Sequence, residues 1–224
     1  MTRRILVIGN KNYSSWSLRP WLALRMAGID FEEVRIPLGT NDTRRAILAH
    51  SPAGKVPVLR DGERCVHESL AICEYAAELA PAAQLWPADA GARAHARSVS
   101  AEMHAGFAAL RGSLPMNARV EGGRLATPLG DEARADVQRV AALLEDCRDR
   151  FGAGGPFLFG RFGIADAMFA PVASRFRTYS VPLPPRAQAW ADAVLALEPM
   201  QQWARDARAE TERAPSYDSL LAAR

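Results

Sequence analysis

Residues 52–72 read Pro-Ala-Gly-Lys-Val-Pro-Val-Leu-Arg-Asp-Gly-Glu-Arg-Cys-Val-His-Glu-Ser-Leu-Ala-Ile. An apolar run at 56–59, the turn-forming pair Asp61-Gly62 and a return run that begins at Cys65 predict a β-hairpin. Pro57 stands near the start of the first strand, although proline has no N–H to give to a sheet ladder. We therefore expect something other than a neighbouring strand to face the backbone here.

A carboxylate and a hydroxyl, from Glu68 and Ser69, follow the hairpin and precede an apolar run with helical spacing. They lie at a helix N-terminus, where the first backbone N–H groups have no partner within the helix. An extended, peptide-like ligand along the edge at Val56 would place one end at these two residues. The segment is thus the predicted centre of a binding site.

The composition is that of an ordinary globular protein, with 224 residues of which 49% are hydrophobic and 24% charged. Three cysteines, Cys65, Cys73 and Cys147, form no close pair, which argues against a disulfide framework or a zinc site and favours a reducing compartment. No apolar run approaches the roughly 18 residues of a membrane span, and the N-terminus is too short in apolar residues for a signal peptide. We expect a cytoplasmic protein without membrane contact.

The net charge is +3 and the pI is about 9.0, which raises the question of a nucleic-acid partner. The arginines are scattered singly among acidic residues and do not cluster with aromatic side chains on one segment. A solvated mixed surface explains that pattern, so we expect no nucleic-acid binding.

Periodicity predicts an α+β protein of two domains, with the order βαβαββα before a proline-rich linker and only helices after it. The boundaries are 1–80 for the first domain, 81–88 for the linker and 89–224 for the helical domain. In the first domain we expect strands at 5–8 and 31–37 and in the hairpin. We expect one helix that ends at Gly28, a short second helix that begins near 41–42 and a third helix at 68–79. The helical domain is expected to contain helices at 91–114, 130–151, 164–176, 185–197 and 199–208, followed by a polar tail.

Four segments of this pattern resemble cytosolic glutathione transferases over residues 4 to about 210. Residues 14–19, Ser-Ser-Trp-Ser-Leu-Arg, are similar to the serine-rich signature of the zeta class. The other three resemble the cis-proline segment, the γ-glutamyl-binding segment and the start of the core helix of the helical domain; they are 54–59, 66–72 and 159–166. The resemblance implies a thioredoxin-like N-terminal domain, glutathione as co-substrate and a homodimer.

The resemblance also implies roles for individual residues. Ser14 would donate a hydrogen bond to the glutathione sulfur, and the backbone of Val56, before a cis Pro57, would pair with the cysteinyl unit. The remaining residues that the resemblance places around glutathione are Ser15, Trp16, Lys55, Glu68 and Ser69, with Lys55 near the glycine carboxylate and Glu68 and Ser69 near the γ-glutamyl end. Tyr13 and Ser15 remain alternatives to Ser14 as the residue that contacts the sulfur.

The chemistry that this arrangement needs is modest. A free thiol with a pKa near 8.5 is only a few per cent thiolate at neutral pH, and the thiolate is the nucleophile. A pKa lowered by two units corresponds to about 2.7 kcal/mol. A charge-assisted hydrogen bond contributes roughly 1.5–3 kcal/mol, so Ser14 at the positive end of a helix suffices and we expect no metal.

The second substrate, a small electrophile, is expected in a cleft between the domains. The candidates for its pocket are Tyr13, Met103, His104, Phe107, Arg111 and Arg175. For Met103 and Phe107 the pattern favours packing between helices over a place in the pocket. Arg111 or Arg175 would suit an anionic co-substrate if either points inward.

Three features depart from the zeta pattern. Trp16 stands where that class has cysteine, the loop Gly9 to Tyr13 is longer by about two residues, and Gly163 replaces a Ser or Thr helix cap, with Asp166 still able to reach the backbone. We expect a detoxifying glutathione transferase; a glutathione-dependent isomerase of the maleylacetoacetate type, a reductive dehalogenase and a non-enzymatic glutathione-binding protein are the alternatives.

Overall fold

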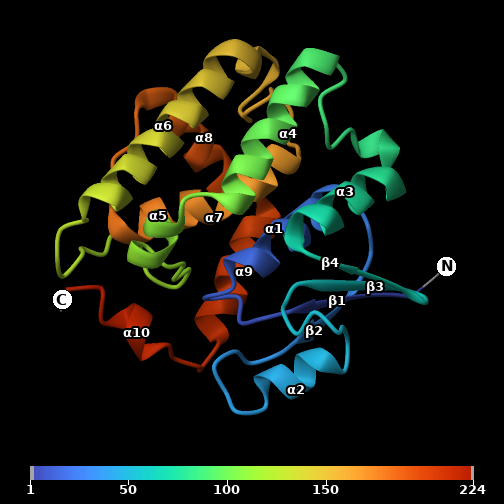
Figure 1. Cartoon of the computed structure of the whole chain (residues 1–224). Helices are drawn as coiled ribbons and strands as arrows, with labels where there is room; N and C mark the ends of the chain where they lie inside the picture. The colour runs from blue at the N-terminus through green and yellow to red at the C-terminus, as the bar shows by residue number, and fades with distance from the viewer. Residues whose placement is uncertain (1–2, 223–224) are drawn as a thin grey trace.

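The structure is a computed structural model that describes residues 3–222. A four-stranded sheet lies in the lower half of the molecule, and most of the helices lie above it (Figure 1). The arrangement is a thioredoxin-like domain followed by a helical domain, as the sequence predicts.

The sheet has the strand order β2-β1-β3-β4. Its strands are β1 (Arg4–Ile8), β2 (Glu32–Arg35), β3 (Val58–Asp61) and β4 (Arg64–His67). β1 runs parallel to β2 and antiparallel to β3, which pairs antiparallel with β4. The parallel pair is joined through a helix, as a crossover connection requires.

Three helices cover the two faces of this sheet (Figure 1). They are α1 (Ser15–Met26) and α3 (Ser69–Leu79) on the face toward the helical domain, and α2 (Thr43–Leu48) on the other. Side chains of β1 alternate accordingly: Leu6 and Ile8 join the large core, whereas Val7 joins a smaller one with Ile47 of α2. Both faces of β1 are therefore buried, which explains its uninterrupted apolar run.

The hairpin differs from the prediction at both ends. β3 begins at Val58, two residues later than expected, because Pro57 cannot donate to the ladder. The turn is Gly62-Glu63 rather than Asp61-Gly62, since Asp61 still pairs with Arg64. Gly62 has φ +61°, which suits glycine at the first position of a two-residue turn.

The rest of the described chain consists of helices and the loops between them, with a few isolated β-bridges. Its helices are α4 (Ala90–Ala105), α5 (Ala108–Ser113), α6 (Asp131–Phe151), α7 (Ile164–Tyr179), α8 (Pro185–Ala196), α9 (Glu198–Ala209) and α10 (Pro215–Asp218), with short 3-10 turns at Pro81–Ala83 and Gly152–Gly154. α7 is buried along almost its whole length and packs against α1, α4 and α8. It thus joins the two domains.

One prediction about these helices is wrong, and one helix was not predicted. The single helix expected at 91–114 is broken at Gly106 and Phe107, because Phe107 adopts a left-handed conformation, with φ +60°, that turns the chain between α4 and α5. The polar tail contains α10, which the sequence did not predict because its apolar contact is made by one aromatic side chain, Tyr217, with Tyr13.

Asp166 secures the start of α7. Its carboxylate accepts hydrogen bonds from the N–H groups of Gly163 (2.9 Å) and Leu158 (2.9 Å) and from Nε1 of Trp190 (2.8 Å). Burial raises the pKa of Asp166 to about 6, against the opposing effect of these donors. The prediction that Asp166 reaches back to the backbone beside Gly163 is confirmed.

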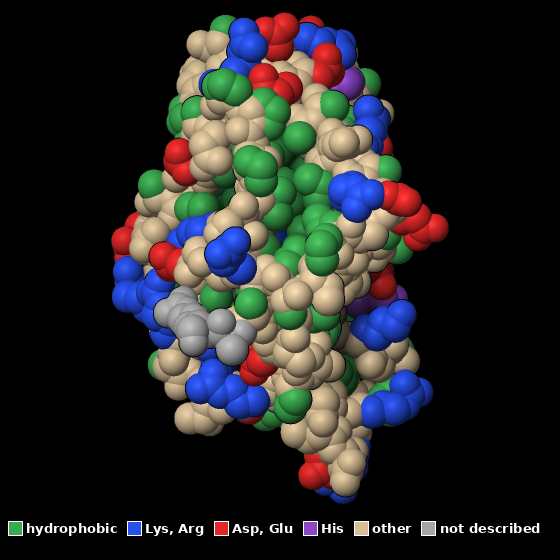
Figure 2. All heavy atoms as spheres, turned by 90° about the vertical axis from the view of Figure 1, so that its left-hand side faces the viewer, with side chains coloured by type: hydrophobic (Ala, Val, Ile, Leu, Met, Phe, Trp, Pro, Cys, Tyr) green, Lys and Arg blue, Asp and Glu red, His purple; other side chains and the backbone are tan. Residues whose placement is uncertain are grey.

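On the face drawn in Figure 2, basic and acidic side chains are interspersed, and hydrophobic side chains gather in the hollowed middle of its upper half. That distribution agrees with the mixed surface expected from the sequence. Within residues 3–222 no helix has the length and apolar character needed to cross a membrane.

Candidate active site

The first turn of α1 presents a pair of coupled hydroxyl groups. Ser14 caps the helix, and its Oγ lies 2.7 Å from Oγ of Ser17. Ser17 Oγ accepts a hydrogen bond from the N–H of Gly9 (3.1 Å), so the Ser17 proton is available for Ser14. In that arrangement Ser14 accepts from Ser17 and keeps its own proton for a ligand.

A hollow of about 370 Å³ lies beside this turn and is lined by Trp16, Ala53, Lys55, Val56, Pro57, His67 and Glu68. The Val56-Pro57 peptide bond is cis. Among residues 3–222, neither the N–H nor the C=O of Val56 forms a hydrogen bond. An unpaired backbone edge therefore faces the hollow. A ligand in extended conformation could form hydrogen bonds with this edge, which is what the sequence predicts.

Two further signs of a ligand lie at the start of α3, where Glu68 lines this hollow and Ser69 follows it. Glu68, which precedes α3, has φ +73°, a conformation that is costly for a residue with a side chain. The hydroxyl of Ser69 is fully buried and has no hydrogen-bond partner within the described chain. A buried hydroxyl without a partner is unfavourable, so a polar group of a ligand would satisfy it.

A second hollow, of about 420 Å³, adjoins the first and shares Trp16, Lys55 and Val56 with it. Its lining also includes Tyr13, Ser14, Ser15, Arg111, Arg175 and Tyr217. The structure thus brings together residues of the N-terminal domain, α5, α7 and α10. The predicted residues Tyr13, Arg111 and Arg175 all lie at this cavity.

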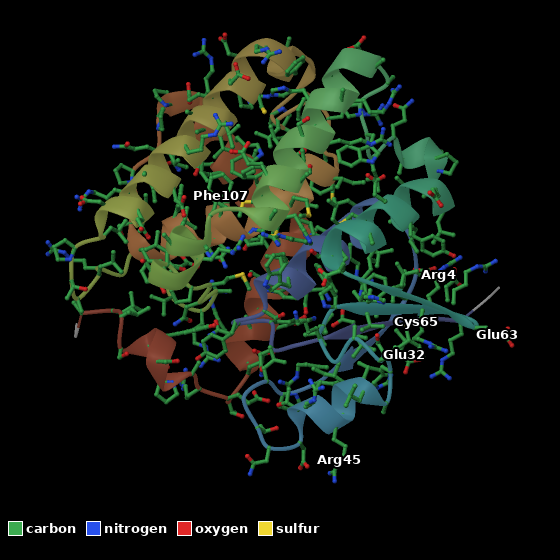
Figure 3. The ribbon with its side chains drawn as sticks, viewed as in Figure 1. Arg4, Glu32, Arg45, Glu63, Cys65 and Phe107 are labelled. Carbon is green, nitrogen blue, oxygen red and sulfur yellow. The ribbon has the colours of Figure 1, made fainter. Side chains whose placement is uncertain are left out.

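Three other predicted pocket residues do not line it. Met103 is fully buried in the core of the helical domain, and Phe107 is also part of that core, between α4 and α5 (Figure 3). Both side chains therefore pack between helices. His104 lies on the side of the first hollow, with its ring against the edge of Trp16 (5.4 Å between ring centroids) and Nε2 3.7 Å from the Glu68 carboxylate.

Positive charge surrounds Trp16. The guanidinium groups of Arg19 and Arg111 lie over its ring, at 4.2 and 5.4 Å from the centroid, and Arg175 donates to Ser15 Oγ (3.0 Å). Burial, together with the charges of the neighbouring arginines, lowers the pKa of Arg19 to about 9 and that of Arg175 to about 10. Both side chains remain cationic at neutral pH.

The two most deeply buried of these cations are incompletely paired. Nη1 and Nη2 of Arg19 and Nε and Nη1 of Arg175 have no hydrogen-bond acceptor among the described residues, although both side chains are almost completely buried. Arg111 differs, because the charge of Asp136 opposes the lowering of its pKa by burial. An uncompensated buried charge is costly. The site is therefore electrostatically prepared for a negatively charged group, such as a thiolate or a carboxylate.

The cysteines are not placed for nucleophilic chemistry. Cys73 is buried, and burial raises the pKa of its thiol to about 12. Cys65 lies on the hairpin beside Glu63 (Figure 3), and its Sγ contacts the carbonyl of His50 at 3.7 Å. The described residues hold no group of three or more His, Cys, Asp and Glu side chains suited to a metal.

The sequence reasoning missed Arg19 and Tyr217 as members of the site. Arg19 ends the serine-rich segment 14–19. The available signal was a cation among the apolar residues of a helix. No such signal marks Tyr217, since its proximity to Tyr13 (5.6 Å between ring centroids) depends on the path of the C-terminal segment.

A cavity of about 430 Å³ elsewhere, between residues 84–89 and Phe159, contains none of the predicted site residues. Its lining is mainly apolar and offers no hydroxyl or unpaired backbone edge comparable to those at α1. The arrangement around Ser14 remains the best candidate for chemistry.

Comparisons with known proteins identify the family of both domains. Residues 13–79 match the model of the N-terminal domain of glutathione S-transferases and residues 118–193 that of the C-terminal domain. A protein of Caenorhabditis elegans named "probable maleylacetoacetate isomerase" is 37% identical over 87 residues, which are 39% of this chain and 41% of that protein. The chain thus matches less than half the length of this relative.

Solved structures match over nearly the whole chain. A glutathione transferase homologue from Burkholderia, solved with bound glutathione, is 25% identical and has a TM-score of 0.68 over 92% of this chain and 98% of its own. A glutathione transferase from Methylococcus capsulatus is 26% identical, with a TM-score of 0.67 over 91% and 98%. Because the matched domains, taken together, cover more than half of its residues, this chain belongs to the glutathione S-transferase family.

Proposed function

We propose that this protein is a glutathione transferase in which Ser14 stabilises the glutathione thiolate for attack on a small electrophile. The observation that carries the proposal is the Ser14 hydroxyl, supported from behind by Ser17 and facing the cavity that Val56 also lines. Val56 would pair with the cysteinyl unit of glutathione, which places the sulfur near the start of α1.

The rest of glutathione would occupy the first hollow and its rim. Ser69 Oγ, buried and without a partner, would donate to the γ-glutamyl carboxylate, while Glu68 would accept from the γ-glutamyl ammonium group. Lys55, exposed at the rim, would pair with the glycine carboxylate. Ser15 and Trp16 would form the wall against the cysteinyl unit.

The reaction then needs little beyond positioning and charge. The bound thiol loses its proton to water, and the thiolate is stabilised by the Ser14 O–H, by the N-terminus of α1 and by the nearby guanidinium groups. The thiolate sulfur forms a bond to an electrophilic carbon of the second substrate. In a conjugation the leaving group departs with the electron pair of its broken bond.

We further propose that the second substrate carries a carboxylate. Arg175 and Arg111 line the second hollow, Nε and Nη1 of Arg175 have no acceptor within the described chain, and the bidentate guanidinium geometry suits a carboxylate. Tyr13 and Tyr217 would pack against the apolar part of that substrate.

A glutathione-dependent isomerase is the second candidate, favoured by the same cations and by the resemblance to the Caenorhabditis elegans protein. There the thiolate would add to a double bond, the carbon skeleton would rotate, and elimination would regenerate glutathione. A zeta-like, serine-type subclass belongs to this proposal, although Trp16 replaces the cysteine of the zeta pattern. We also propose a homodimeric, cytoplasmic protein with a role in detoxification, in keeping with its family and its unpaired cysteines.

Calorimetry with glutathione, followed by a panel of neutral and carboxylate-bearing electrophiles, tests the proposal. We expect binding of glutathione and glutathione-dependent turnover that favours the carboxylates. Analysis of the products separates a conjugate from an isomer or a dehalogenated product. No binding of glutathione would contradict the proposal and favour a protein that keeps the fold without the chemistry.

A further inference from the structure

The loop that precedes Ser14 is held by distant parts of the chain. Its residues Lys11 and Asn12 donate their backbone N–H groups to the two carboxylate oxygens of Glu210, at 2.6 and 3.0 Å. Their carbonyl groups accept from Nε1 of Trp203 (2.7 Å) and from the N–H of Ala118 (3.1 Å). All four backbone polar groups thus bond to the helical domain and the C-terminal segment.

Glu210 is itself held in place. Its side chain is only 6% exposed, and its carbonyl accepts a hydrogen bond from Nη2 of Arg119 (3.1 Å). Arg35 approaches the carboxylate at 3.7 Å and pairs more closely with Glu212, at 2.6 Å. The Glu210 carboxylate is therefore held in a fixed orientation in which it accepts both hydrogen bonds from the loop.

The loop is directly linked to Ser14. The carbonyl of Asn10 accepts hydrogen bonds from the N–H groups of Tyr13 (3.2 Å) and Ser14 (2.8 Å), so residues 10–14 form one tight turn. Lys11 and Asn12 are buried, and water cannot readily replace Glu210 as their partner. Without the carboxylate the turn would carry two unsatisfied N–H groups next to the residue that faces the sulfur.

We propose that Glu210 is a positioning residue for the reaction: its carboxylate fixes Lys11 and Asn12 and thereby sets the orientation of the Ser14 hydroxyl toward the glutathione sulfur. This inference rests on the proposed role of Ser14. It makes the segment after α9 part of the active-site support, although that segment lies some 200 residues from Ser14 along the chain.

The test compares Glu210→Gln with Glu212→Gln in the full-length protein. The Glu212 variant is a matched control, because Glu212 lies in the same segment and pairs with Arg35 but does not contact the loop backbone. In each variant the thiolate absorbance of bound glutathione is titrated against pH, and kcat, KM and Tm are measured. Glu210→Asp, which keeps the charge with a shorter reach, is the conservative variant.

We expect Glu210→Gln to raise the pH midpoint of bound thiolate formation by about one unit, toward the value near 8.5 of a free thiol. At a pH below both midpoints, a midpoint one unit higher lowers the thiolate fraction about ten-fold. We therefore expect kcat to fall about ten-fold, with KM for glutathione little changed. Glu210→Asp should give an intermediate midpoint, and Glu212→Gln should match the wild type.

A lower Tm in the Glu210 variants, with an unchanged kcat and an unchanged pH midpoint of thiolate formation, would overturn the inference. Glu210 would then have a purely structural role. Ser14→Ala distinguishes this failure from that of the proposed function. If Ser14→Ala moves the midpoint and Glu210→Gln does not, only the inference fails. If Ser14→Ala leaves the midpoint unchanged, the role of Ser14 fails. If the roles of Ser14 and Glu210 are both correct, adding Glu210→Gln to the Ser14→Ala variant should not shift the pH midpoint further.

Discussion

Arg175 of α7 donates a hydrogen bond from Nη2 to the hydroxyl of Ser15 on α1, at 3.0 Å. Both side chains are buried, and they are 160 positions apart in the sequence. This bond ties the helical domain to the turn that carries Ser14. Nε and Nη1 of Arg175 have no acceptor within the described chain, and the residue lines the second hollow.

Replacing Arg175 should therefore affect anionic substrates selectively. For Arg175→Met we expect KM for a carboxylate-bearing electrophile to rise at least about ten-fold, because a hydrogen bond to a charged group contributes roughly 1.5–3 kcal/mol. The methyl ester of the same electrophile should change much less, and steady-state kinetics with the acid and ester measures both. Arg177→Met is the control, since Arg177 pairs with Glu121 and does not line this cavity. Equal losses on acid and ester would contradict the assignment.

Ser69 offers a test of the glutathione end. Ser69→Ala should weaken glutathione binding by about ten-fold or more, because a hydroxyl that binds a carboxylate is removed. Calorimetry gives Kd directly. Ser100→Ala is a matched control: Ser100 Oγ is also buried and without a partner, but it lies on α4, whereas Ser69 directly follows Glu68 of the first hollow. An unchanged Kd in the Ser69 variant would remove Ser69 from the binding site.

Asp166 predicts a pH dependence of stability. Because burial raises its pKa from 3.8 to about 6, the folded protein binds a proton more tightly than the unfolded chain does. The contribution of this group to stability is complete below about pH 4 and is lost as the pH rises through about 6, by up to about 3 kcal/mol. Urea unfolding between pH 4 and 7.5 should show the stability of wild type, relative to Asp166→Asn, falling over that window. If the stability of wild type relative to Asp166→Asn rises with pH instead, the three N–H donors lower the pKa of Asp166 by more than burial raises it.

Much of the fold was predictable because local patterns and tertiary structure agree. The hairpin, the proline at its edge and the Glu68-Ser69 helix start are encoded within residues 52–72, and the apolar periodicity gave most helices. The break at Phe107 was not predictable, since a left-handed phenylalanine is imposed by packing and has no sequence signal of its own.

The candidate site divides in the same way. The first hollow is built mainly from residues that are close in the sequence and have recognisable chemistry, whereas the second hollow is assembled from α1, α5, α7, α10 and the loops beside them. Pairs such as Lys11 with Glu210 depend on how the C-terminal segment crosses the N-terminal domain. A single sequence contains no signal for contacts over such separations.

The most direct test of the account is the ionisation of glutathione bound to Ser14→Ala, followed by its thiolate absorbance as the pH is varied. The account predicts that the midpoint rises by about two units toward the value near 8.5 of a free thiol, with about a hundred-fold loss of kcat at a pH below both midpoints and a Kd for glutathione within about two-fold of wild type. A midpoint and kcat equal to those of the wild type would contradict the claim that Ser14 activates the thiol.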